Sequence, residues 1–275
     1  MRIGHWQLEC IPGDVQANTN EVVEHLELAA KAGIEVLSFP ESMLTGYYRT
    51  EELARANSIE TNGAEIAELL ARTASRDLTF MVGYNERRGE ELRNTVLVAR
   101  AGKILGTYSK AFPCFGYFTP GRDFPVFQHD DLIFGVVICA DGGYIEPTRI
   151  LALKGARVVF APHYNYIAAQ GLLDHFVRVR SDHTARAREN EIWFLRGNNV
   201  CSGRDAGLDT DGVGYGDSYL VDPTGEIIVR GQRHVENLLS FDLPTPLGSA
   251  TRRSLVSAQA LGEHLLEVVR DLPEH

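Results

Sequence analysis

The chain has 275 residues, of which 44% are hydrophobic and 23% charged, and its net charge is −10. This size and composition suit one large soluble domain over residues 1–275, with residues 245–275 as a C-terminal helical extension. The acidic balance argues against a nucleic-acid partner. No apolar run approaches the ~18 residues that span a membrane, and no signal peptide is visible. The four cysteines lack paired spacing, which is typical of proteins in a reducing compartment. We therefore expect a cytoplasmic protein without a membrane partner.

The predicted elements alternate between strands and helices along the chain. Hydrophobic patterning predicts strands over 2–9, 35–40, 78–84, 94–100, 103–109, 132–138, 158–161, 191–196, 216–222, 226–230 and 237–242. Helices are predicted between the first two strands, with Asn18 or Thr19 as N-cap, and over 63–75, 146–155, 175–190 and 255–270. Helices placed between buried strands indicate an α/β fold with some antiparallel hairpins.

The most informative stretch is residues 135–142, GVVICADG, in which a predicted buried strand ends in Cys139. A side chain at the carboxyl end of such a strand faces the crevice where α/β folds bind ligands. The turn into the next helix offers backbone N–H groups and a positive helix end, which favour thiolate over thiol. Cys139 is therefore a candidate nucleophile, although a free cysteine is often simply buried.

A cysteine hydrolase also needs a base and a donor that holds the oxyanion. None of the nine histidines lies in a recognisable Cys–His motif. Glu41 directly follows an apolar strand, where a carboxylate can act as general base. Lys110 ends a hairpin strand and could serve as a fixed cation for an oxyanion. Position alone equally allows a loop glutamate and a solvated lysine.

In the order Glu41, Lys110, Cys139, the sequence resembles the nitrilase (carbon–nitrogen hydrolase) superfamily. Further motifs extend this resemblance over about residues 1–245. They are residues 39–41 (FPE) with 44–47 (LTGY), 94–95 (NT) with 102–110 (GKILGTYSK) and 118–121 (FTPG), 138–141 (ICAD) with Glu146 and Arg149, 187–190 (AREN) with 198–199 (NN), and 215–218 (YGDS) through 222–225 (DPTG).

The resemblance implies a four-layer α-β-β-α sandwich that forms a homodimer or a higher homo-oligomer. It also implies hydrolysis of a C–N bond without metal or organic cofactor. Glu41 would take the proton of Cys139, whose sulfur attacks the substrate carbon, while Lys110 and the backbone N–H of Ala140 stabilise the oxyanion. Ammonia would leave a thioester, which water activated by Glu41 hydrolyses.

Three departures from the family's pattern affect the site. Residues 111–118 contain no acid, whereas family members often carry a second glutamate there. Residue 140, often aromatic, is alanine, and Gly142 and Gly143 supply no arginine for a substrate carboxylate. The last point disfavours N-carbamoyl amino acids as substrates. Cys114, in the acid-free segment, is interpreted as a bystander or a pocket wall.

Six residues are expected to line the substrate pocket: Tyr47, Tyr117, Tyr144, His163, Tyr164 and Asn165. Of these, residues 163–165 follow the strand after the nucleophile helix and could match substrate polarity, or could simply form loop hydrogen bonds. The histidines at 129, 163, 175 and 183 have no metal-ligand spacing. The arginines at 178, 180, 186 and 188 are interpreted as a solvated or intersubunit helix face rather than a phosphate site.

We therefore expect a hydrolase that releases ammonia from a small linear amide or carbamoyl compound. Two alternatives remain: a nitrilase acting on a small nitrile, and a catalytically silent or acyl-transferring relative that binds a partner. The sequence identifies neither the substrate nor the oligomer number, and leaves open whether the missing glutamate lowers activity.

Overall fold

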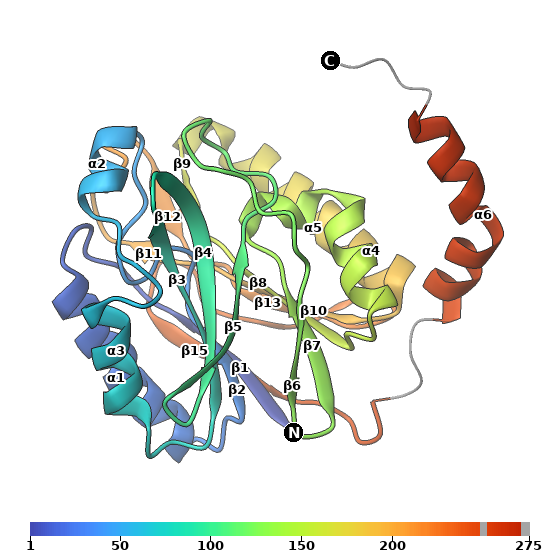
Figure 1. Cartoon of the computed structure of the whole chain (residues 1–275), viewed down its shortest axis with the longest axis horizontal. Coiled ribbons are helices and arrows are strands. Elements are labelled where there is room, and N and C mark those ends of the chain that lie inside the picture. Colours follow the sequence, from blue (N-terminus) through green and yellow to red (C-terminus); the bar gives the residue numbers. More distant parts are fainter. Residues whose placement is uncertain (248–251, 271–275) are drawn as a thin grey trace.

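The computed structural model of the chain, which describes residues 1–247 and 252–270, contains two six-stranded sheets with helices on their outer faces (Figure 1). The strand order is β15-β1-β2-β3-β4-β5 in the first sheet and β14-β13-β10-β8-β7-β6 in the second. Each sheet combines parallel central strands with antiparallel neighbours. The expected α/β class and its layered arrangement are thus confirmed.

The first sheet comes mostly from the N-terminal half of the chain. Its strands are β1 (Arg2–Gln7), β2 (Val36–Ser38), β3 (Thr79–Arg88), β4 (Glu91–Arg100), β5 (Lys103–Ser109) and β15 (Asn237–Asp242), and its helices are α1 (Val15–Lys31), α2 (Glu51–Ala56) and α3 (Ala64–Thr73). Helix α1 begins earlier than expected because the Asp14 carboxylate caps it, accepting from the N–H of Ala17 at 2.9 Å. The prediction of Asn18 or Thr19 as the cap is wrong; both are buried inside the helix.

The second sheet is built from residues 126–230. Its strands are β6 (Val126–His129), β7 (Leu132–Val136), β8 (Val158–Pro162), β10 (Trp193–Gly197), β13 (Tyr219–Val221) and β14 (Ile227–Arg230), and its helices are α4 (Ile145–Leu153) and α5 (Leu172–Asn190). A small third sheet holds β9 (Tyr166–Ile167), β11 (Val200–Cys201) and β12 (Val213–Tyr215). Sequence patterning missed α2, β6, β9, β11 and β12 because short elements carry little periodicity.

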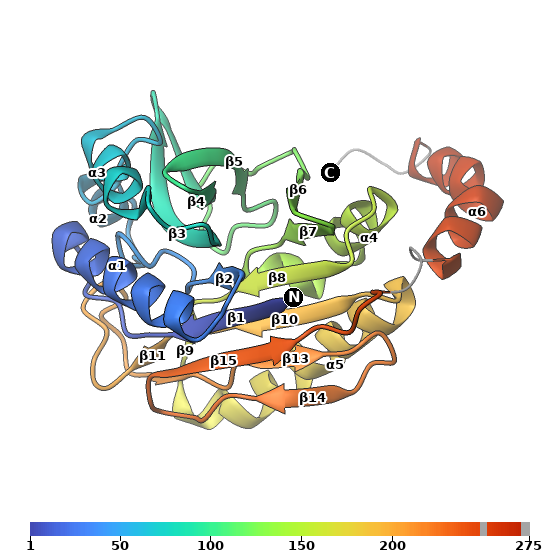
Figure 2. The same cartoon turned by 90° about the horizontal axis from the view of Figure 1, so that it is seen from below.

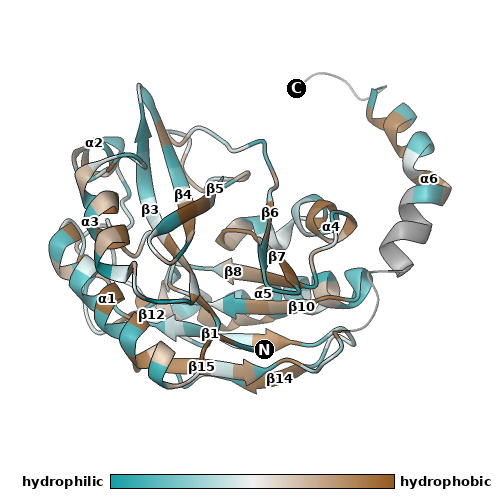
Figure 3. Cartoon of the chain, turned by 60° about the horizontal axis from the view of Figure 1, so that its bottom comes forward, coloured by the Kyte–Doolittle hydropathy of each residue, from teal (hydrophilic) through white to brown (hydrophobic). Residues whose placement is uncertain are grey.

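Three buried clusters correspond to the three interfaces of a four-layer sandwich. One joins α1 and α3 to the first sheet, one lies between the sheets, and one joins the second sheet to α4 and α5. The central cluster pairs residues such as Val36 and Val98 with Phe134 and Leu195. In Figure 1 the two groups of helices accordingly stand on opposite sides of the sheets, and Figure 3 shows hydrophobic colouring along their strands.

The C-terminal helix α6 (Arg252–Arg270) projects from one end of the sandwich, where it contacts α4 and α5 (Figure 2). It confirms the helix predicted over 255–270, and residues 248–251 and 271–275 of the predicted extension lie outside the described residues. Large apolar side chains on α6 are exposed, including Leu265 and Leu266. Over the described residues, no helix combines the length and the apolar character that crossing a membrane requires.

Candidate active site

Cys139 lies just after β7, on a sharp turn that opens the short 3₁₀ helix Cys139–Gly143. Its φ of 48° places it in the left-handed region, which a non-glycine residue adopts only when its surroundings hold it there. The buried carboxylate of Asp141 supplies part of that hold. It accepts from the N–H of Ile138 at 3.1 Å, the hydroxyl of Tyr108 at 2.7 Å and the N–H of Phe112 at 2.8 Å. These bonds attach the cysteine turn to the segment that follows Lys110.

Glu41 and Lys110 form an ion pair whose side chains are both completely buried, with Lys110 Nζ 2.7 Å from Glu41 Oε1. Asn94 also donates to Oε1 at 2.6 Å, and the N–H of Tyr164 donates to Oε2 at 2.8 Å. Both carboxylate oxygens are therefore satisfied, as a buried charge requires. The sequence placed Glu41 and Lys110 at the ends of strands, and the fold brings them together.

The electrostatics of the site differ from the expected thiolate. Burial raises the pKa of the Cys139 thiol well above its usual range, the Glu41 carboxylate adds to this increase, and Lys110 opposes it. The expectation that the turn alone would favour thiolate is therefore wrong: desolvation outweighs the helix end. For Lys110, burial alone would lower the pKa, but Glu41 and other neighbouring groups raise it well above its usual value. Lys110 thus keeps its charge while the sulfur stays protonated.

A second polar network lies behind the sulfur. Asn165 Nδ2 is 3.6 Å from Cys139 Sγ, and Asn165 Oδ1 accepts from Arg196 Nη2 at 2.6 Å and from the Tyr215 hydroxyl at 3.2 Å. Arg196 is fully buried in β10. Sequence reasoning missed Arg196, although an arginine within an apolar strand was an available signal.

A cavity of about 550 Å³ opens in front of Cys139 and Ala140. Five of the six residues predicted to line the pocket do so: Tyr47, Tyr144, His163, Tyr164 and Asn165. Tyr117 does not line this cavity; its ring stacks on Phe115 at 5.5 Å between centroids, and its hydroxyl donates to the carbonyl of Tyr48. The cavity is large enough for a small linear molecule.

The glycines after Cys139 allow α5 to approach the cysteine turn. A Cβ on Gly142 would lie 3.1 Å from His183 Nε2, and one on Gly143 would lie 3.4 Å from Asp182 Oδ2. Asp182 and Arg178 line the cavity together with His183. Helix α5 therefore brings charged side chains to the cavity, whereas the glycines next to the nucleophile bring none.

The acid-free segment after Lys110 brings Cys114 close to the pair, with Cys114 Sγ 3.7 Å from Lys110 Nζ. Cys114 also lines the cavity. Lys110 is oriented by Glu41, and Asp141 anchors the segment through Phe112. These contacts together position Lys110 and its loop although the segment itself carries no carboxylate.

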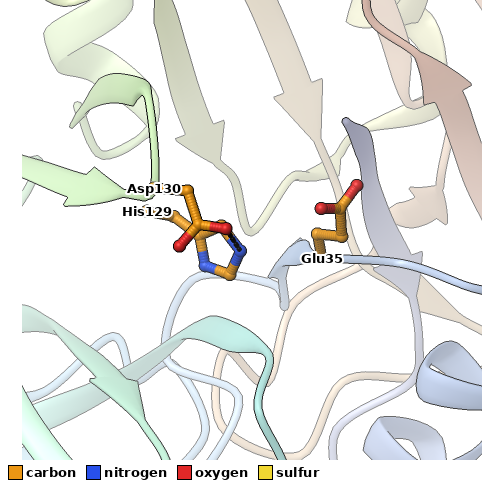
Figure 4. Close-up of side chains that lie close together, drawn as sticks. All are labelled: Glu35, His129 and Asp130. Carbon is orange, nitrogen blue, oxygen red and sulfur yellow. Dashed lines mark ion pairs between the residues drawn. The ribbon is translucent and has the colours of Figure 1, made fainter.

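The one group of potential metal ligands among the described residues lies elsewhere, at Glu35, His129 and Asp130 (Figure 4). Their ligand atoms lie within 4.8 Å of one another. His129 Nδ1 already contacts the Thr79 hydroxyl at 2.7 Å, and Asp130 pairs with Arg100 at 3.1 Å. These groups are already partnered, so the cluster gives no support for a metal site.

The fold is a layered α/β sandwich with a cavity over Cys139. The carbon-nitrogen hydrolase family model matches residues 2–253, so the chain belongs to this family and is a carbon–nitrogen hydrolase. It is 30% identical over 249 residues to an (R)-stereoselective amidase from Pseudomonas sp., covering 88% of this chain and 85% of that protein.

Two further similarities concern a larger enzyme and a solved fold. The chain is 27% identical to the glutamine-dependent NAD(+) synthetase of Thermotoga maritima, over 88% of this chain but only 42% of the synthetase. The NitN amidase from Neterenkonia sp. AN1 superposes with a TM-score of 0.79 at 23% identity, covering 96% of this chain and 99% of that one. The latter similarity supports the fold.

Proposed function

We propose that the protein hydrolyses the C–N bond of a small linear amide or carbamoyl compound, using Glu41, Lys110 and Cys139. The observation that carries this proposal is the buried Glu41–Lys110 pair, with 2.7 Å between the charged groups, behind a cavity lined by Cys139. A protonated thiol beside a buried carboxylate is suited to proton transfer at the moment of attack.

In the first half of the reaction the Glu41 carboxylate removes the proton of the Cys139 thiol as the sulfur attacks the substrate carbonyl carbon. The new C–S bond pushes the carbonyl electrons onto oxygen. Lys110 and the backbone N–H of Ala140 stabilise that oxyanion, and each such donor contributes about 3–4 kcal/mol. When the oxyanion collapses, the C–N bond breaks, the nitrogen takes the proton from Glu41, and ammonia leaves a thioester.

In the second half Glu41 removes a proton from water as the water oxygen attacks the thioester. Collapse of this second oxyanion breaks the C–S bond, and its electron pair returns to sulfur. The sulfur then regains a proton through Glu41, while the product leaves as an acid. The chain's own residues suffice for every proton transfer, so no metal or organic cofactor enters the scheme.

The polar lining of the cavity bears on the substrate. Tyr47, His163 and Asn165 provide polar contacts near the sulfur, whereas Arg178 and Asp182 place opposite charges on the α5 side. Arg178 supplies a cation that Gly142 and Gly143 cannot. Arg178 therefore offers a site for a substrate carboxylate, and N-carbamoyl amino acids belong among the substrates to be tested.

We also propose that the protein is a homodimer or a higher homo-oligomer. Exposed apolar residues on three helices support this: Ile145 on α4, Leu173 and Val177 on α5, and Leu265 and Leu266 on α6. Exposed apolar residues that gather on one face of a protein commonly mark an interface. Sedimentation velocity would test it, and a monomer at micromolar concentration would refute it.

Ammonia release from a substrate panel tests the proposed reaction. The panel contains aliphatic amides, ω-amides of dicarboxylic acids, carbamoyl compounds including N-carbamoyl amino acids, and nitriles. We expect release from an amide or carbamoyl compound that is abolished in Cys139→Ala, with a thioester trapped in the wild type by rapid acid quench and mass spectrometry.

The matched control is Cys201→Ala, which removes a thiol that does not line the cavity and is partly exposed like Cys139. Its turnover should equal that of the wild type. Full activity in Cys139→Ala or Glu41→Gln would contradict the proposed mechanism. A nitrile as the best substrate would make the protein a nitrilase, and an unreactive panel together with an inert Cys139 would favour the partner-binding alternative.

A further inference from the structure

Arg196 is a buried cation without an acidic partner among the described residues. Its side chain is completely buried, and its four recorded hydrogen bonds go to neutral oxygens: the carbonyls of Gly216 and Asp217, the Asn165 amide and the Tyr215 hydroxyl. A buried charge normally needs a counter-ion. The arrangement is therefore costly and calls for a functional explanation.

The nearby carboxylate of Asp217 is already engaged. It binds Arg180 at 3.1 Å, Arg230 at 3.0 Å and Arg233 at 3.0 Å, and only its backbone carbonyl accepts from Arg196. Asp217 therefore forms no ion pair with Arg196 and leaves its positive charge uncompensated.

Arg196 dictates which way the Asn165 amide points. A guanidinium can only donate, so the Asn165 atom that it contacts at 2.6 Å must be the oxygen. Tyr215 donates to the same oxygen at 3.2 Å. The amide nitrogen is then the atom 3.6 Å from Cys139 Sγ, and it presents N–H groups to the sulfur. The backbone of Asn165 is held as well, because its N–H donates to the side-chain oxygens of Asn198 and Asn199.

We infer that Arg196 is a positioning residue that holds Asn165 as the hydrogen-bond donor to the Cys139 thiolate. The inference rests on the proposed function, in which that thiolate forms twice. It forms when Glu41 removes the thiol proton, and again when the C–S bond of the thioester breaks and its electron pair returns to sulfur. An N–H donor stabilises the thiolate relative to the thiol, since only the thiolate is a strong acceptor.

The most direct test is Asn165→Asp, which keeps the shape of the side chain and gives Arg196 a carboxylate partner. This variant replaces the donor at sulfur with an acceptor. We expect iodoacetamide to alkylate Cys139 about 10- to 100-fold more slowly than in the wild type, as for loss of a hydrogen bond to a charged group. Peptide mass spectrometry separates Cys139 from the other three cysteines. An unchanged or faster rate would overturn the inference.

Asn165→Leu and Arg196→Met complete a double-mutant cycle. Each single variant should slow alkylation by a similar factor, and the double variant should be no slower than the slower single, because the two residues act in series. Independent, multiplying effects would overturn the inference. Circular dichroism checks that each variant is folded, and Asn165→Asp decides the question if Arg196→Met does not fold.

Steady-state kinetics separate positioning from substrate binding. Loss of a donor to sulfur should lower kcat by a similar factor and change KM less than about threefold, whereas loss of a substrate contact should raise KM. A raised KM with unchanged kcat would overturn the inference. Alkylation needs no substrate, so slowed alkylation without amide turnover would refute the proposed function alone, and amide turnover insensitive to Asn165 would refute this inference alone.

Discussion

The two sheets present buried cations to the same cysteine in different electrostatic settings. Lys110, from the first sheet, lies 2.7 Å from the Glu41 carboxylate. Arg196, from the second sheet, donates only to neutral oxygens within the described residues. The first cation is half of an ion pair whose carboxylate is the proposed general base, and the second is the proposed positioning residue for the Asn165 amide.

This difference explains how the site combines reactivity with rigidity. A lysine whose partner is the proposed general base keeps its charge through the reaction. The net charge of the pair changes each time Glu41 takes up or releases a proton. An arginine remains charged at every accessible pH and binds through a planar fork, so it suits a constant role. We therefore expect substitutions around Lys110 and around Arg196 to have different effects on stability and activity.

The largest effect is expected for Lys110→Met, which leaves Glu41 buried without its cation. Removing one partner of a buried pair costs about 3–5 kcal/mol, and the oxyanion donor is lost as well. We expect a correspondingly lower free energy of unfolding, measured by urea denaturation, and ammonia release reduced to the background of Cys139→Ala.

The double variant Lys110→Met/Glu41→Gln distinguishes charge from packing. It removes both charges, so most of the lost stability should return while activity stays absent. Equal destabilisation of the single and double variants would mean that packing, rather than the unpaired carboxylate, causes the loss.

A smaller effect is expected from acid, through neutral histidines near Arg196. Burial, with a smaller contribution from the positive charge of Arg196, lowers the pKa of His5 to about 3. Below pH 6.5, the ordinary pKa of histidine, His5 binds a proton in the unfolded chain but not in the folded protein. The contribution of His5 to the free energy of unfolding is therefore complete above pH 6.5 and is lost as the pH falls toward 3. Each pH unit below 6.5 should remove about 1 kcal/mol of unfolding free energy for this residue.

Urea midpoints at pH 7, 6 and 5 measure this slope, and His5→Gln is the matched control. His5 Nε2 donates to the carbonyl of Asn198 at 3.1 Å, and Nδ1 accepts from Ser38 at 2.9 Å. Glutamine can both donate and accept, but it does not titrate. The variant should therefore show a shallower slope, and equal slopes would exclude His5 as a contributor.

The smallest effect is expected for Cys114→Ser. The sulfur lies 3.7 Å from Lys110 Nζ, but Glu41 already orients that lysine. We expect kcat within about threefold of the wild type, because a weak acceptor is replaced by a similar one. A loss above tenfold would show that residue 114 takes over part of the role of the missing glutamate.

The sequence was sufficient for the family, the α/β class and most long elements. Glu41 and Cys139 each follow a strongly apolar strand, whose local pattern is specific, and Lys110 follows a hairpin strand. Five of the six expected pocket residues follow from the same reasoning, since segments after parallel strands gather at one edge of a sheet. The prediction for Tyr117 was wrong because its neighbours in space, Phe115 and Tyr48, decide which way the ring points.

The tertiary structure alone decided the electrostatics of the site. The sequence could predict a thiolate from the helix end after Cys139, but the desolvation that keeps the thiol protonated depends on what the whole fold packs around the sulfur. The pairing of Asn165 with Arg196, and the approach of Asp182 to Gly143, join segments that lie far apart in the chain. Local patterns report which face of an element is buried, whereas burial energies and the direction of a hydrogen bond depend on partners that only folding brings together.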